Sequence, residues 1–558
     1  MIKKSLHAKK TFLVGILFLA FFLLLRLPGI SLPFHQDEMK TALGARAGGE
    51  ALGSFFHPPL TQLLYRTEAI LFGADSFRLF ILIFSLLGGV LATFIVKRRL
   101  GLHTTLFFLL FLATGAYSVH ASLMLDTDGA ILPLFFLASI YFYDRIYETE
   151  GNKRRLFFGL MFLSLILGFL VKLSFILVVG AIMLDFLYRE RKRLTKKMII
   201  ISVLSLIGFF LCFLLAIFAI KFFNPFFSIE GMVSHLRSFI NFKQRGWMQI
   251  LIQALKAIFY LSPVLIVPLL FITKEIFEKT RIFFIYLGSG FIFYFIIFDF
   301  SQGALDKYLM FSIIPLSVIS AAIITPVIEE NKEKKKIGGI VVGILGAITI
   351  ILLALLPHTL FPLYPKTLWL SNIVHFNWNI LFPLTGGSGP LGFYMSFLVI
   401  AFSFIFSFIL GLIALFKRNF RYSIFIAILI IGLTHNVIFT QEFLYGGLYG
   451  SAPKVLKESL EFIENSPNIK EVITYNDSGG YELHKMEKYA GRFYAVPGYE
   501  EGHKKKFAEF KGHYLVVDMP KISKDSFYGQ FFAKCTSLFK AKSRAIESNV
   551  YECSTSKK

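Results

Sequence analysis

The chain has 558 residues, of which 56% are hydrophobic and 17% aromatic, and this composition excludes an ordinary soluble domain. The formal net charge is +23, but the lysine and arginine residues occur in short clusters between apolar runs. Clusters placed in this way are typical of membrane topology signals, so we predict no nucleic-acid partner.

About thirteen apolar runs are long enough to cross a bilayer, which takes roughly 20 residues each. The first run follows a basic start and has no small-residue cleavage motif, so we expect it to remain as a membrane span. The sequence therefore predicts an α-helical polytopic protein of the plasma (inner) membrane. The runs lie near residues 11–30, 76–96, 104–121, 129–146, 156–171, 173–188, 198–221, 249–273, 282–299, 308–327, 337–356, 392–416 and 422–440.

Basic clusters such as Lys97–Arg99 and Arg189–Lys197 follow alternate runs. If the N-terminus is cytoplasmic, every loop on the inner side carries a basic cluster, as the positive-inside rule requires. The outer side then receives the tail and the longer loops, which are 31–75, 222–248 and 357–391.

The tail, residues 441–558, is far more polar than the transmembrane region 1–440. Helical periodicity covers 455–464, strand patterns cover 471–475 and 513–517, and a loop signal at 476–480 separates them. We expect a compact extracytoplasmic α/β domain.

The tail also contains Cys535 and Cys553, whereas Cys212 lies alone in an apolar run. A disulfide between the two tail cysteines fits an extracytoplasmic location, and two free thiols are the alternative.

The first outer loop opens with an acidic pair, Asp37–Glu38, followed by Lys40. Charge at the membrane edge is costly and is usually kept for function. A carboxylate can take a proton from an attacking hydroxyl, and a nearby lysine can hold a phosphate. The alternative is an acidic residue that caps the start of a helix.

Later in the same loop, His57 precedes Pro58 and Pro59. A histidine there can donate to a phosphate oxygen or bind a metal. A plain loop-to-helix transition, with proline in the first turn, explains the same residues.

A spaced acidic pair, Asp126 and Asp128, lies between the third and fourth runs. We favour Asp126 for function because it lies closer to the end of the third run. Asp128, together with Thr127, is expected to cap the following helix.

Two outer lysines, Lys172 and Lys307, stand apart from the basic clusters. The positive-inside rule predicts no lysine at an outer position such as 172. An anionic lipid phosphate is therefore a natural partner for Lys172. Snorkelling of the side chain to lipid headgroups is the alternative for both residues.

Taken in order, these features resemble the GT-C superfamily of polyprenyl-phosphate-sugar-dependent glycosyltransferases, which includes protein O-mannosyltransferases and lipid A aminoarabinose transferases. The resemblance covers roughly the first 330 residues through motifs, and the remainder only through the span count and the outer tail. Its motifs lie at 37–38, 56–60, 73–79, 125–127, 168–172 and 307–315.

The resemblance implies inverting sugar transfer on the outer face, from a polyprenyl-phosphate sugar held in a membrane-level cavity. It implies a lipid, glycan or protein acceptor and leaves open whether a divalent metal takes part. The aminoarabinose enzymes have a lysine at the position of His57. The histidine of this chain instead matches the broader group. By position, the catalytic candidates are Asp37, Glu38 and Asp126, and the phosphate-binding candidates are Lys40, His57, Lys172 and Lys307.

Two other classes share some of these features. A lipid-linked sugar transporter or flippase usually shows paired halves with broken helices, and this sequence shows no such symmetry. A polysaccharide ligase or polymerase would place its residues in the late outer loop 357–391. The candidates there are His358, Lys366, His375 and the glycine-rich segment Gly386–Gly389, which could equally form a lid.

Overall fold

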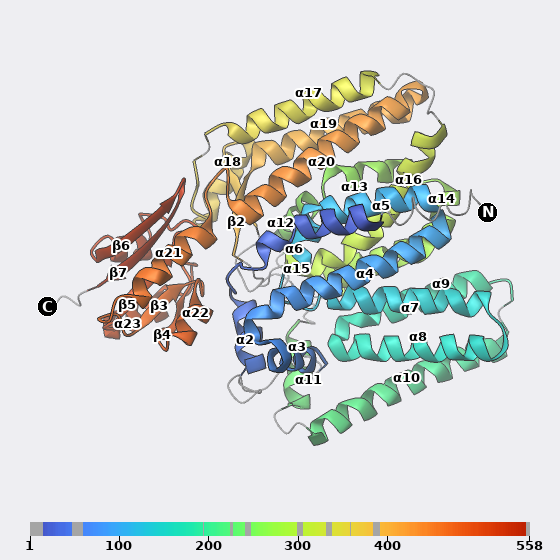
Figure 1. The fold of residues 1–558 in the computed structure, drawn as a ribbon, viewed down its shortest axis with the longest axis horizontal. Coiled ribbons are helices and arrows are strands. Elements are labelled where there is room, and N and C mark those ends of the chain that lie inside the picture. The colour runs from blue at the N-terminus through green and yellow to red at the C-terminus, as the bar shows by residue number, and fades with distance from the viewer. Residues whose placement is uncertain are drawn as a thin grey trace.

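The computed structural model describes a bundle of helices joined to a small C-terminal domain (Figure 1). The long helices run roughly side by side, and the C-terminal domain lies beyond one end of the bundle. The chain is therefore divided as its composition predicts, with an apolar part followed by a polar part. The described residues are 15–46, 60–193, 195–223, 227–239, 247–297, 305–330, 337–357, 359–382 and 391–553.

Within these described residues, eight helices are long and apolar enough to cross a membrane. A ninth span results if Ala254–Tyr260 and Pro263–Phe271, which meet at a bend of 100°, count as one broken span. The chain is thus a multi-pass membrane protein. The eight spans are Phe77–Leu100, Gly151–Val171, Ser202–Phe222, Lys274–Ile297, Leu309–Glu329, Ile337–Leu355, Phe397–Phe416 and Arg418–Tyr445.

The remaining predicted runs also contain helices, but these are shorter or carry more charge. Helix α5 (Leu102–Thr114) has 13 residues and α9 (Ile176–Glu190) has 15. Helix α7 (Ile131–Glu148) has 18 residues with three charged residues near its end. Another short apolar helix covers Gly15–Gly29. The predicted apolar runs therefore contain helices, and eight of these helices are long and apolar enough to count as complete membrane spans.

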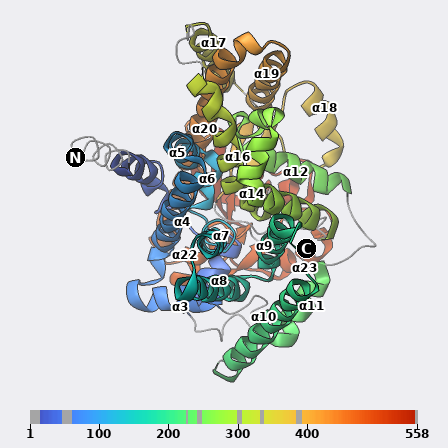
Figure 2. The ribbon, with the colours of Figure 1, turned by 90° about the vertical axis from the view of Figure 1, so that its right-hand side faces the viewer.

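The bundle has a packed centre and two flanks (Figure 2). Helices α4 (Phe77–Leu100), α5, α7 and α16 (Ile313–Glu330) form the centre, where α4 contacts α5 and α7, and α5 contacts α16. One flank consists of α17 (Ile337–Leu355), α19 (Phe397–Phe416) and α20 (Arg421–Tyr445), and the other of α8 (Gly151–Val171) and α10 (Lys196–Phe223). Only 17% of the α10 span is buried, which leaves most of its surface available to lipid.

Two helices interrupt the segment that the sequence predicts as the first outer loop. They are α2 (Asp37–Arg46) and α3 (Leu60–Phe72), and they pack against each other. Figure 1 shows both at the end of the bundle that faces the C-terminal domain. The other helices between α10 and α17 are α11 (Ile229–Phe239), α12 (Trp247–Tyr260), α13 (Pro263–Ile266), α14 (Lys274–Ile292) and α15 (Leu305–Tyr308).

The late outer loop contains α18 (Trp369–Val374) and a small antiparallel sheet. Strand β1 (Asn379–Phe382) pairs with β2 (Phe393–Ser396), and Tyr260 of α12 contacts Phe382 of β1. The sheet therefore packs on the bundle, a feature that the sequence pattern does not predict.

The C-terminal domain is built on a mixed sheet in the order β4-β3-β5-β7-β6. Strand β3 (Val472–Tyr475) is parallel to β4 (Tyr489–Phe493) and β5 (His513–Val517), whereas β7 (Ile546–Glu552) is antiparallel to β5 and β6 (Thr536–Ser543). The strands expected at 471–475 and 513–517 are present, and the helix expected at 455–464 is α21 (Ala452–Glu464). The shorter helices of the domain are α22 (Gly480–Lys485), α23 (Glu500–Glu509) and α24 (Phe527–Phe532).

The two faces of this sheet are covered in different ways. Helix α21 begins at Ser451, whose side chain caps the helix, and packs its apolar stripe on β6 and β7. Aromatic side chains such as Phe493, Phe507 and Tyr514 fill the other face. A disulfide joins Cys535 to Cys553, so of the two alternatives for this pair the structure has the bonded one.

Candidate functional site

Asp37 lies at the start of α2 and is held between two lysines. Its carboxylate is 2.9 Å from Nζ of Lys40, one turn later in the helix. Its other oxygen is 3.0 Å from Nζ of Lys307, which lies 270 residues further along the chain on α15. Asp37 is thus the first residue of α2, and its side chain takes part in an ion-pair network.

Lys307 extends this network to the second acidic motif. Its Nζ is 3.2 Å from Oδ2 of Asp126, so one lysine bridges Asp37 and Asp126. The Tyr65 hydroxyl of α3 donates to the Asp126 backbone carbonyl over 3.2 Å. Residues from the first outer loop, the 122–130 segment and α15 therefore meet at one point.

The third predicted lysine, Lys172, ion-pairs with Asp128. Lys172 follows the last residue of α8 and is 8% exposed, which excludes the extended snorkelling conformation. Its Nζ also lies 4.3 Å from the ring centroid of Tyr308, the neighbour of Lys307. Asp128 does not cap α7, because the N-cap position of this helix is Ala130 and no side-chain hydrogen bond caps it there.

Glu38 points away from Asp37, into the protein. It is 1% exposed and forms a bidentate ion pair with the fully buried Arg78 of α4, at 2.8 and 2.7 Å. Oε1 of Glu38 also accepts the Leu125 amide over 2.9 Å. Arg78 donates further to the carbonyls of Leu32 and Pro33, each over 2.8 Å.

We call the pair Glu38–Arg78 the clamp, because it fixes both acidic motifs at once. Glu38 is the neighbour of Asp37, and the amide that it holds belongs to the neighbour of Asp126. A buried charged side chain that is ion-paired and fully hydrogen-bonded is held firmly in one position. The sequence includes Arg78 in the family motif 73–79 but does not indicate its partner, because Glu38 lies 40 residues earlier in the chain.

The charges around Asp37 determine its ionisation. Burial alone would raise the pKa of this carboxyl, but Lys307 and Lys40 outweigh that effect and lower its pKa below the ordinary value. Burial would lower the pKa of Lys307, yet Asp126, Tyr308 and Asp37 raise it well above its ordinary value. Asp37 is therefore ionised and Lys307 charged at neutral pH.

The C-terminal domain contacts the first outer loop directly. The Tyr481 ring of α22 packs edge-on against Phe34, with ring centroids 4.9 Å apart. The Tyr481 hydroxyl and the Lys485 ammonium both contact the Asp75 carboxylate, over 3.3 and 3.0 Å. Gly480 lies so close to Met39 of α2 that an added Cβ would be 2.6 Å from the sulfur.

A polar group of this domain lies on the same side as Asp37. Asp477 is fully buried, ion-pairs with Arg492 and accepts the Tyr489 hydroxyl over 2.6 Å. Arg492 also lies 5.2 Å from the ring of Tyr494. Burial, then Asp477, and to a smaller extent Asp37 raise the pKa of the Tyr494 phenol, which places Tyr494 within electrostatic range of Asp37.

Several predicted residues cannot be placed in this cluster. His57, His358 and the segment Gly386–Gly389 lie outside the described residues, as does the side chain of Lys366. His375 follows the last residue of α18 and is exposed, with its ring Nδ1 2.7 Å from the Ser371 carbonyl of that helix. Among the described residues, no group of three or more His, Cys, Asp or Glu side chains is placed to hold a metal ion.

Comparisons with known proteins agree with this architecture. Residues 56–217 match a family model described as dolichyl-phosphate-mannose-protein mannosyltransferase. A search of curated proteins finds no match. Crystal structures of ArnT from Cupriavidus metallidurans are similar over almost the whole chain. The apo form has a TM-score of 0.57 at 15% identity, covering 97% of this chain and 98% of that one.

The structure of the same ArnT bound to undecaprenyl phosphate has a TM-score of 0.53 at 14% identity, with 98% and 99% of the two chains covered. Arabinosyltransferase EmbB from Mycobacterium smegmatis reaches a TM-score of 0.41 at 12% identity over 79% of this chain and 43% of that one, too weak for an argument. The chain is thus a polytopic membrane protein with a fold similar to that of ArnT. This similarity extends from the first described helix to the C-terminal domain.

Proposed function

We propose that this protein is an integral-membrane inverting glycosyltransferase. It moves a sugar from a polyprenyl-phosphate donor to a hydroxyl or phosphate of a lipid, glycan or protein acceptor. The reaction takes place on the outer face of the membrane. The observation that carries the proposal is the ionised Asp37 between Lys40 and Lys307, at the bundle end that faces the C-terminal domain.

The chemistry assigned to Asp37 is that of a general base. The acceptor oxygen attacks the anomeric carbon as the bond from this carbon to the phosphate oxygen breaks, and polyprenyl phosphate leaves. Asp37 takes the proton of the attacking hydroxyl and becomes a neutral carboxyl. The carboxylate thereby loses one negative charge as the departing phosphate gains one. An acceptor phosphate that is already ionised needs no such base.

The two lysines serve the departing phosphate. Without a ligand, Lys40 and Lys307 hold Asp37 ionised but also reduce its basicity. A bound phosphate competes for both ammonium groups, which leaves the carboxylate more basic when the donor is in place. Lys40 is the more adaptable contact because its side chain is 46% exposed.

The remaining candidates receive supporting roles. Asp126 anchors Lys307, and Asp128 holds Lys172 close to the Tyr308 ring. Glu38 is assigned to positioning, because its carboxylate is buried and engaged by Arg78 and the Leu125 amide. This differs from the catalytic role that its place beside Asp37 predicts.

The fold supports a lipid-phosphate donor, since the similar ArnT has been crystallised with undecaprenyl phosphate. The C-terminal domain supports the acceptor side of the proposal. Tyr494 of this domain lies within electrostatic range of Asp37, where an acceptor must place its attacking oxygen, and Arg492 lies beside the Tyr494 ring. We assign these two residues to the acceptor.

A donor panel tests the function. Membranes that contain the protein are incubated with radiolabelled polyprenyl-phosphate sugars, and the products are analysed by mass spectrometry. We expect one sugar to appear on an acceptor with release of polyprenyl phosphate. Movement of the labelled lipid across the bilayer without any glycosylated product would instead identify a flippase.

A further inference from the structure

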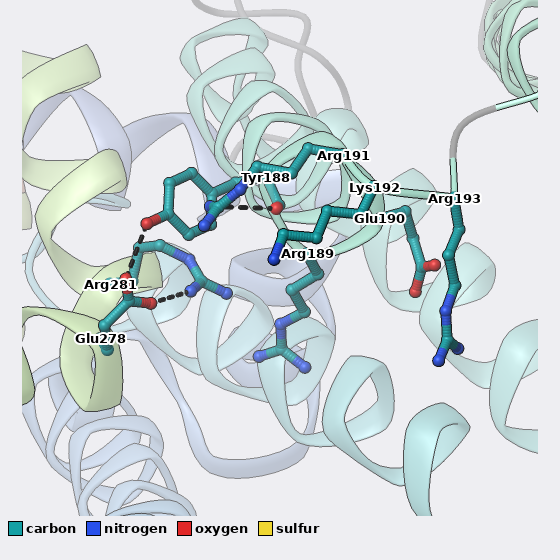
Figure 3. A pocket seen from close by; sticks show the side chains of 8 residues that line it. All are labelled: Tyr188, Arg189, Glu190, Arg191, Lys192, Arg193, Glu278 and Arg281. Carbon is teal, nitrogen blue, oxygen red and sulfur yellow. Dashed lines mark hydrogen bonds and ion pairs between the residues drawn. The ribbon is translucent and has the colours of Figure 1, made fainter.

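A cavity of about 430 Å³ lies where α9 ends and α14 begins. Figure 3 shows that its side chains come from two parts of the chain that are far apart in sequence, with Arg281 and Glu278 facing Tyr188. Five of the eight lining residues are basic and two are acidic. The lining residues are Tyr188, Arg189, Glu190, Arg191, Lys192, Arg193, Glu278 and Arg281.

Tyr188 organises this cavity. The guanidinium carbons of Arg191 and Arg281 lie 3.9 and 4.3 Å from its ring centroid, within the range of a cation–π contact. Its hydroxyl donates to Glu278 over 2.6 Å, and the other oxygen of Glu278 accepts from Arg281 over 2.6 Å. The cationic wall is therefore held in place before any ligand arrives.

The charges in this cavity are only partly compensated. The fully buried Asp185 accepts Arg189 and Arg281, each over 2.7 Å, and so accounts for two of the five cations. Over the part of the chain that the structure describes, no carboxylate lies within ion-pair distance of Arg191, Lys192 or Arg193. An anion in the cavity would face these three exposed cations.

The cavity lies at the bundle end remote from the C-terminal domain (Figure 1). Helix α9 connects the two ends, since it starts just after Lys172 and finishes at Glu190. The chain continues from the cavity into α10, whose span is mostly exposed and apolar. The exposed cations of the cavity match the phosphate headgroup of a phospholipid. The apolar surface of α10 beside them matches its acyl chains.

We propose that this cavity binds the phosphate headgroup of an anionic phospholipid, in the leaflet opposite the candidate active site, with the acyl chains along α10. Basic pockets between membrane helices bind anionic headgroups in this way. A free phosphate ion shares the headgroup chemistry but not the contact with α10, so the two sources can be separated by experiment.

The first experiment uses the wild-type protein in a neutral detergent and measures its melting temperature. We expect phosphatidylglycerol to raise the melting temperature, and phosphatidylcholine or millimolar inorganic phosphate to leave it unchanged. An equal shift with phosphatidylcholine, or a full shift with phosphate alone, would overturn the assignment to an anionic lipid.

The second experiment counts the phosphatidylglycerol molecules retained in native mass spectrometry. The variant R191A/K192A/R193A is compared with K153A/R154A/R155A, which removes the same charge from the start of α8. Each basic residue near an anionic headgroup contributes about fivefold, so we expect retention to fall about 10- to 100-fold in the first variant only. Equal losses in both variants would show a general effect of charge and no site.

Discussion

At the scale of single residues, the candidate site depends on which charges surround Asp37. Burial and the two lysines act on its pKa in opposite directions, and the lysines prevail. Lys307 has the larger influence of the two and also bridges to Asp126. This lysine therefore couples donor binding to the ionisation of the base.

The variant Lys307→Met removes that cation, so burial is expected to raise the pKa of Asp37. The protonated fraction then grows at a higher pH, and the acidic limb of the profile of kcat/KM shifts upward. The donor KM is expected to rise about tenfold, as one charged phosphate contact is lost.

Lys457→Met is the matched control, because Lys457 is an exposed lysine of α21 in the C-terminal domain. Its pH profile is expected to coincide with that of the wild type. If the acidic limb of the kcat/KM profile does not shift in Lys307→Met, Lys307 does not control the ionisation of Asp37.

The sequence singles out Asp37, Asp126 and three of the lysines at this scale, but not their partners. Lys172 and Asp128 are 44 residues apart, and neither spacing nor periodicity indicates that they pair. Arg78 escapes notice in the same way, because its partner Glu38 lies 40 residues away in the chain. Pairing is a property of the tertiary structure.

At the scale of elements, the clamp Glu38–Arg78 joins α2 to α4 and to the segment before α7. Its charges are both buried, so each depends on the other for compensation. The position of α2, and with it Asp37, should therefore depend on a residue that never meets the substrate.

For Glu38→Gln we expect a loss of about 3 kcal/mol in the free energy of unfolding, because Arg78 keeps a buried charge without its carboxylate. The melting temperature in detergent measures this loss. The double variant E38Q/R78M should recover part of it, since the unpaired charge is then removed.

The control is Glu275→Gln, which breaks the exposed ion pair with Lys279 and should hardly change the melting temperature. If Glu38→Gln melts as the wild type does, the clamp does not fix α2.

A second prediction at this scale concerns the C-terminal domain. We expect Arg492→Ala to raise the KM of the acceptor several-fold and to leave the donor KM unchanged, since Arg492 belongs to the C-terminal domain and lies beside Tyr494, which is assigned with it to the acceptor. Steady-state kinetics with each substrate varied in turn distinguish these effects. Lys504→Ala, on exposed α23, is the control, and a change in the donor KM alone would contradict the assignment.

At the scale of the whole molecule, hydropathy and charge predict much of the architecture, because the eight spans found among the described residues are long apolar segments bounded by polar residues. The same signals do not predict that α2 and α3 form within the first outer loop or that β1 and β2 pack on α12. These elements are short, and their stability comes from contacts with distant parts of the chain. In the C-terminal domain, β3 and β5 were predictable from their apolar patterns, whereas β4, β6, β7 and the order of the strands were not.

The orientation in the membrane gives a prediction for the whole molecule. In a Cys212→Ser background, a cysteine replacing Glu501 of α23 should react with a membrane-impermeant maleimide in intact cells. A cysteine replacing Lys153, at the start of α8, should react only after permeabilisation. The opposite pattern would put the candidate site on the cytoplasmic side.

The central claim is that Asp37 accepts the proton of the acceptor hydroxyl, and Asp37→Asn tests it most directly. Transfer of labelled sugar is measured in membranes, with binding of the polyprenyl-phosphate donor measured on the same preparation. We predict that transfer falls by about 10²- to 10⁴-fold while donor binding and expression are largely retained. Transfer at the wild-type rate in Asp37→Asn would contradict the account.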